Sequence, residues 1–63
     1  MEIKDALKLP SGMYSGTHDG NRGAMLFREE GHGFSLWVPG NRDCYEVSDY
    51  DEDGNLVEIR IFR

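Results

Sequence analysis

The chain has 63 residues, of which 12 are acidic and seven basic, so its net charge is -5 at pH 7. This length has room for one domain, and so small a core supplies only about 3 to 5 kcal/mol of stability. The charge argues against general binding to nucleic acid or anionic lipid and favours basic partners. The share of apolar residues is that of a folded domain, which argues against disorder.

The first ten residues, MEIKDALKLP, predict a short helix or arm that precedes the rest of the domain. Ile3, Ala6 and Leu7 have helical spacing, and Pro10 is a stop signal. Charged residues interrupt this segment, whereas a signal peptide needs a continuous apolar run. The single Cys44 cannot close an internal disulfide. A cytoplasmic location is therefore expected. The longest apolar run, Ala24 to Phe27, is far shorter than the roughly 20 residues of a membrane-spanning helix.

Residues 11–63 predict a mostly β fold, a single small antiparallel meander of about five strands. Turn residues, chiefly Gly, Asn and Asp, separate short apolar runs. The expected strands are residues 12–17, 23–29, 33–38, 43–49 and 56–62.

Alternation of side chains assigns the faces of the sheet. Phe34, Leu36 and Val38 point to one face, with Val57, Ile59 and Ile61 expected beside them, whereas Ser35, Trp37, Glu58, Arg60 and Phe62 point to the other. Strand 23–29 is apolar on both faces and therefore needs two covers. The sheet could curl into an SH3-like barrel, carry the helix, or offer its second face to a partner, and the last strand could pair at its edge with a second copy.

The acidic ladder Asp49, Asp51, Asp53 followed by Gly54 resembles the start of a calcium loop. Arg60 stands where the closing Glu of an EF-hand belongs, and the residues after the ladder alternate as a strand does. We therefore predict a hairpin turn. A looser cation site built by the same three carboxylates is the alternative.

Acidic side chains are expected to gather at one end of the meander. Between Asp43 and Ile59 lie seven acids and no base. Alternate turns of a meander share an end, so the following residues should lie together with only His32 to balance them: Glu29, Glu30, Asp49, Asp51, Glu52 and Asp53.

The sequence contains no pattern of a catalytic or zinc-binding site, so no cofactor and no enzymatic activity are expected. His18 and His32 fall in turns at opposite ends, and Cys44 lies between acids that disfavour its thiolate.

The leading hypothesis is a small acidic protein-binding module, a regulator or inhibitor that occupies a basic or apolar site on a larger protein. Some phage-encoded inhibitors of host defence are proteins of this size and kind. Trp37 and Arg60 are the candidate anchors, with Asp49, Asp51, Glu52 and Asp53 as a patch that steers the partner. The alternative is a cation-binding or nucleic-acid-associated small barrel, with Trp37, Phe27, Tyr14 and Tyr45 as stacking faces beside Arg22, Arg42 and Arg60.

Overall fold

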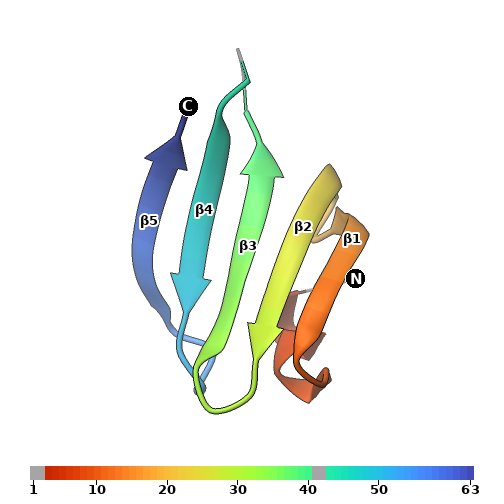
Figure 1. Ribbon diagram of the computed structural model, residues 1–63. Helices are drawn as coiled ribbons and strands as arrows, with labels where there is room; N and C mark the ends of the chain where they lie inside the picture. Colours follow the sequence, from red (N-terminus) through yellow and green to blue (C-terminus); the bar gives the residue numbers. More distant parts are fainter. Residues whose placement is uncertain (1–2, 41–42) are drawn as a thin grey trace.

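The computed structural model describes residues 3–40 and 43–63 and consists of one antiparallel sheet preceded by a single helical segment (Figure 1). The elements in chain order are η1 (Ile3–Lys8), β1 (Gly12–His18), β2 (Asn21–Glu29), β3 (Gly33–Pro39), β4 (Tyr45–Tyr50) and β5 (Leu56–Phe62). The sheet order is β1-β2-β3-β4-β5, so each strand pairs with its neighbour in sequence. The predicted five-stranded meander is confirmed.

The predicted N-terminal helix is a 3-10 helix of six residues, η1. Residues 1 and 2, which the prediction included, lie outside the described residues, as does Arg42. Asp5 in its first turn and Lys8 in its last complement the helix dipole.

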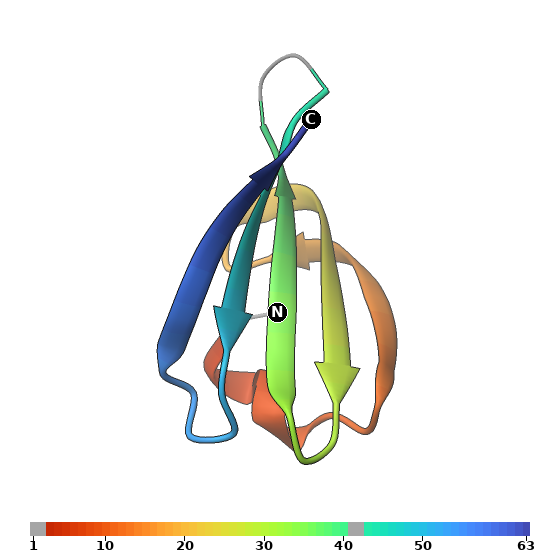
Figure 2. The same ribbon diagram turned by 60° about the vertical axis from the view of Figure 1, so that its left-hand side comes forward.

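The core lies on one face of the sheet, which we call the inner face. Ala24 and Leu26 of β2 and Phe34 and Leu36 of β3 are buried there against Ala6 of η1. Figure 2 shows the strands curling around η1, which lies inside the curve toward the end where β2 meets β3. The helix therefore provides one of the two covers that the apolar pattern of β2 requires.

The sheet does not close into a barrel in the described part of the chain. β1 and β5 are its two edges, and each pairs with a single neighbouring strand. The physical reason is the position of η1: Ala6, with Leu7 and Leu9 packed beside it, covers the inner apolar residues. Burial of the core therefore does not require β1 and β5 to meet.

Ile59 and Ile61 of β5 face as predicted but are not buried, whereas Val57 lies at a bulge that sets Leu56 opposite Tyr50. Ile59 and Ile61 lie level with Leu36 and Val38 of β3 through their shared neighbours on β4, which places all four on the inner face. However, Ile59 is 54% and Ile61 68% exposed, and all seven residues of β5 are exposed. The core formed with η1 does not extend to this edge.

The buried side chain of Arg28 forms hydrogen bonds with three segments at the end of the molecule where η1 lies. Arg28 follows Ala24 and Leu26 on the inner face of β2, and its side chain is only 5% exposed. Its Nη1 donates to the carbonyl oxygens of Glu29 at 2.7 Å and Gly33 at 2.8 Å, and Nη2 donates to that of Leu7 at 3.2 Å. Burial of a guanidinium is costly unless its donors are bonded, and here backbone carbonyls from β2, β3 and η1 accept from Nη1 and Nη2, whereas Nε has no hydrogen-bond partner.

Gly33 is the glycine at this end that another strand approaches most closely. Its φ is +85°, and a Cβ there would lie 2.0 Å from the carbonyl oxygen of Tyr50. Any side chain would therefore push β3 away from the chain leaving β4.

We expect Gly33→Ala to destabilise the fold by about 3 kcal/mol or more, because it adds a backbone clash to a left-handed strain. A loss of this size would remove most of the stability that so small a core supplies. Gly31→Ala is the matched control: Gly31 has φ +87° but open space around it, so it should cost only about 1 kcal/mol. Urea unfolding followed by tryptophan fluorescence measures both, and equal losses would mean that the close approach at Gly33 is not what matters.

Candidate functional site

The predicted acidic end exists, because the β2–β3 and β4–β5 turns lie side by side at one end of the sheet (Figure 1). Glu29 ends β2, Glu30 lies in the first turn, and Asp51, Glu52 and Asp53 lie in the second. Asp49, which was expected at this end, lies within β4 instead. The expectation that only His32 balances these acids is wrong, because Arg28 reaches the same end from within. Its Nη1 lies 2.8 Å from Glu52 Oε1.

The carboxylate of Glu52 accepts two hydrogen bonds from the β2–β3 hairpin. Its Oε1 accepts the backbone N–H of Gly33 at 2.7 Å as well as the guanidinium of Arg28. The bond from Gly33, followed by the bond from Arg28, lowers the pKa of Glu52 below its ordinary value. This carboxylate joins the β4–β5 turn to the β2–β3 hairpin.

Asp51 organises the hairpin turn that the sequence predicted. Its Oδ1 accepts the backbone N–H groups of Asp53 and Asn55, both at 2.9 Å, and Gly54 adopts φ +82°. β4 and β5 pair directly on either side of this turn. The predicted hairpin is therefore confirmed.

The carboxylates of the ladder do not converge on one point. Asp49 lies within β4 and is bound to Arg60 and Ser35, whereas Asp51 is turned toward its own loop backbone. Among the described residues, no group of three or more His, Cys, Asp or Glu side chains is placed to hold a metal ion.

Asp49 and Arg60 form the charged part of the second face, which we call the outer face. Arg60 Nε lies 2.8 Å from Asp49 Oδ2 across the β4–β5 pair and 3.8 Å from Glu58 Oε2. The hydroxyl of Ser35 donates to Asp49 from β3. The guanidinium of Arg60 also lies 5.2 Å from the ring centroid of Phe62, within the range of a cation–π contact.

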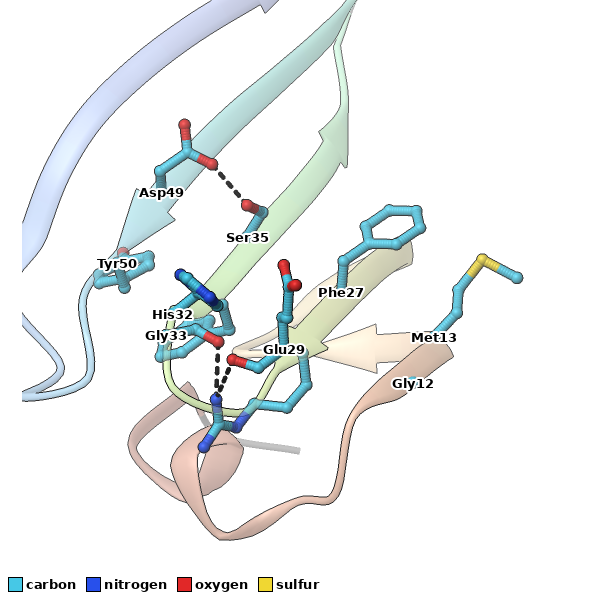
Figure 3. A pocket seen from close by; sticks show the side chains of 11 residues that line it. Gly12, Met13, Phe27, Glu29, His32, Gly33, Ser35, Asp49 and Tyr50 are labelled. Atoms are coloured by element: carbon cyan, nitrogen blue, oxygen red, sulfur yellow. Dashed lines mark hydrogen bonds between the residues drawn. The ribbon is translucent and has the colours of Figure 1, made fainter.

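An open hollow of about 650 Å³ adjoins this charged group. Figure 3 shows Asp49 and Ser35 at one side, Phe27 and Met13 at the other, and Glu29 and His32 near the β2–β3 turn. The hollow is open to solvent, and its lining includes the acids Asp49 and Glu29. It suits contact with a protruding side chain better than enclosure of a substrate.

Four aromatic rings dominate the rest of the outer face, and we call them the aromatic cluster: Phe27, Trp37, Tyr45 and Phe62. Trp37 is central. It stacks on Phe62 with ring centroids 5.2 Å apart, meets Phe27 edge-on at 5.6 Å, and lies 6.1 Å from Tyr45. Such pairings stabilise by about 0.5 to 1.5 kcal/mol each beyond their buried area.

The aromatic cluster lies beside a buried residue of the sheet, but its rings are partly exposed to solvent. Val47, the cross-strand neighbour of Trp37, is fully buried, and Trp37 itself is half-buried. Phe27 is 37%, Tyr45 40% and Phe62 41% exposed, and Met13, paired with Phe27, is 63% exposed. The buried part of Trp37 thus contributes to the packing of the sheet. Its three ring neighbours present a contiguous apolar surface to solvent.

The two histidines lie at opposite ends of the sheet as expected, but the placement of His18 in a turn is wrong. His18 is buried at the end of β1, where its Nε2 lies 3.0 Å from the carbonyl oxygen of Tyr14, whereas His32 is exposed in the β2–β3 turn. Cys44 is half-buried.

One candidate steering acid, Asp49, lies with the candidate anchors, whereas the other acids lie at one end of the sheet. Trp37, Arg60 and Asp49 share the outer face, whereas Glu29, Glu30, Asp51, Glu52 and Asp53 line or adjoin the turns at one end. Arg28 was missed. Its position in the alternation with Ala24 and Leu26 could have indicated a buried cation, because a charged residue there continues a row of apolar residues on the inner face.

No helix of the described residues has the length and apolar character needed to cross a membrane. No family model matches the chain, and no curated protein or solved structure shows significant similarity to it.

We expect the stabilising effect of Glu52 to depend on pH. Because its folded-state pKa is depressed, the stabilisation is fully present above the unfolded pKa of about 4.3 and is lost as pH falls through the lower folded value. The difference in unfolding free energy between the wild type and Glu52→Gln should therefore be largest near neutral pH and should shrink below about pH 4. Urea unfolding at a series of pH values measures it.

Asp53→Asn is the control for this series, because it removes a neighbouring exposed charge whose side chain is outside the Arg28 contacts. It should leave stability nearly unchanged at neutral pH. If Glu52→Gln behaves like Asp53→Asn at every pH, the contact between Glu52 and Arg28 contributes nothing to the fold.

Proposed function

We propose that this protein is a binding module that docks on a larger protein through its outer face, acting as a regulator or inhibitor without chemistry of its own. The observation that supports this proposal is the aromatic cluster, with three partly exposed rings around a half-buried Trp37. In so small a protein, a contiguous exposed apolar surface is a substantial part of one face.

The composition of the aromatic cluster suits a protein interface. Binding energy in such interfaces concentrates in a few central aromatic and Arg residues that are held rigidly before binding. Trp37 is fixed by three ring contacts, and Arg60 is fixed by Asp49 and Phe62. Little conformational entropy would be lost when these side chains become covered.

The charge around the outer face indicates what kind of surface would fit. Asp49 and Glu58 adjoin the aromatic cluster, and the acidic end lies beyond the hollow. With a net charge of -5, the protein would be attracted to an apolar site rimmed by basic residues. The acids then contribute mainly to the rate and specificity of association, and the aromatic residues to its lifetime.

A single-stranded nucleic acid is the competing partner, because exposed rings next to an Arg can stack bases. Arg60, however, is neutralised by Asp49, and both Glu58 and the acidic end would repel phosphates. The same surface is therefore better suited to a protein.

We expect a tagged form of the chain to capture a protein from the lysate of its source cell or that cell's host, more strongly at low salt than at high salt. Once that protein is purified, Phe27→Ser and Tyr45→Ser should each weaken its affinity by roughly tenfold or more, as measured by calorimetry. Thermal melts should show that both variants remain folded, because these rings are already partly exposed.

Val57→Ser is the matched control, since it removes a 66% exposed apolar side chain from β5 without touching the aromatic cluster. It should leave the affinity of a single outer face for the purified partner unchanged, because Val57 lies at the edge strand and outside the aromatic cluster. Equal binding by all three variants would place the contact elsewhere. Capture of single-stranded nucleic acid in place of a protein would contradict the proposal outright.

A further inference from the structure

The two edges of the sheet differ in how open they are to another strand. β1 contains Gly12 and Gly16, and its pairing with β2 shifts between Gly16 and His18, so this edge is irregular. β5 reads LVEIRIF, without Gly or Pro, and is regularly paired with β4 from Glu58 to Phe62. An extended, exposed and largely apolar edge of this kind is a template for strand addition.

The inner side of β5 lacks a cover as well. Ile59 and Ile61 are 54% and 68% exposed, although they belong to the face that forms the core elsewhere. Val57, at the bulge where the strand begins, is 66% exposed. The edge therefore presents its backbone and a row of branched aliphatic side chains together.

The order of residues along β5 makes the strand complementary to itself. In an antiparallel pair related by a twofold axis, centring the axis on Ile59 sets Ile59 opposite Ile59 of the second copy and Val57 opposite Ile61. The same register sets Glu58 opposite Arg60, twice. Both residues lie on the outer face, so each acid meets a base on the same side of the sheet.

The neighbouring symmetric registers lack this match. A twofold axis at Glu58 would set Glu58 against Glu58, and an axis at Arg60 would set Arg60 against Arg60. Like charges directly opposite each other destabilise a strand pair. Charge therefore selects the axis at Ile59 among these registers.

We propose that two copies of this chain pair through β5, antiparallel and centred on Ile59, to form one continuous ten-stranded sheet with reciprocal Glu58–Arg60 ion pairs. The contact is isologous, so it closes as a dimer and leaves β1 as the only remaining edge of each copy. Arg60 can keep Asp49 in its own copy, because a guanidinium has five donors and Glu58 is exposed for the second contact. Pairing at the edge also leaves Phe27, Trp37 and Tyr45 on an open outer face.

Charge reversal tests the register. The wild type should sediment as a dimer, and Glu58→Arg should weaken self-association by roughly tenfold, because two attractive pairs become repulsive. The double change Glu58→Arg with Arg60→Glu restores opposite charges across the axis and should restore the dimer. Residue 58 pairs with Asp49 on β4, and Arg60→Glu removes the positive charge that Asp49 normally contacts. The Arg introduced in place of Glu58 supplies a new positive charge beside Asp49.

Glu30→Arg is the control, because it makes the same change in net charge on the exposed β2–β3 turn, away from β5. It should dimerise like the wild type. Circular dichroism on every variant shows whether a lost dimer reflects a lost fold, and recovery in the double variant argues against that cause.

Cysteine cross-linking tests the position of the axis independently, in a Cys44→Ser background. Opposed residues have Cα atoms about 4.5 to 5.5 Å apart, within disulfide range, so Ile59→Cys should oxidise to a covalent dimer. Ile61→Cys should not, because the two copies of residue 61 would lie roughly four residues apart along the strands, about 13 Å.

The proposal is overturned by a wild type that stays monomeric at millimolar concentration, by a Glu58→Arg variant that dimerises as strongly as the wild type, or by cross-linking at residue 61 in preference to residue 59. None of these outcomes bears on binding through the outer face, which is tested with a purified partner.

Discussion

The contacts of Arg28 hold together the end of the molecule on which the rest of the fold depends. Its guanidinium donates to backbone carbonyls of Leu7, Glu29 and Gly33 and pairs with Glu52. Those groups come from η1, both strands of the β2–β3 hairpin and the β4–β5 turn. A buried charge without its partners is costly, so these segments are stable only in this arrangement.

Because η1 is held in this way, the sheet has one covered face and one open face. The inner face packs against Ala6 and needs no closure of the strands into a barrel. The outer face has only its own side chains for cover, so Trp37 and its ring neighbours shield Val47 and remain partly exposed themselves. The binding surface that we propose is thus a consequence of a core with a single helical cover.

Acidic residues have two different tasks in this chain. Glu52 and Asp51 bind backbone N–H groups and shape the turns, so their charges are part of the fold. Asp49 and Glu58 lie on the outer face beside Arg60, where charge can guide a partner or a second copy. A count of acids at one end of the sheet does not separate these tasks, because it carries no information about which oxygens are already bonded.

The same open sheet connects the two proposals. An unclosed meander leaves both a face and an edge, and the strand at that edge, β5, contributes Phe62 and Arg60 to the face. A dimer formed through β5 would place two aromatic clusters on one continuous surface. A partner with two matching sites would then be bound with higher avidity than by one copy.

The sequence by itself determined the five strands, their order and the alternation of side chains, because period-two patterning and Gly-rich turns are local properties. It also determined that the β4–β5 segment is a hairpin, since Arg60 at the closing position and the alternating residues after Gly54 argue against a helical calcium loop. Only the tertiary structure decided that the sheet stays open, that Arg28 is buried and that Glu52 is its partner. Those outcomes depend on where η1 packs and on contacts of Arg28 with residues more than 20 positions away in the chain. Such contacts leave no periodic pattern in the sequence, so the sequence alone does not reveal them.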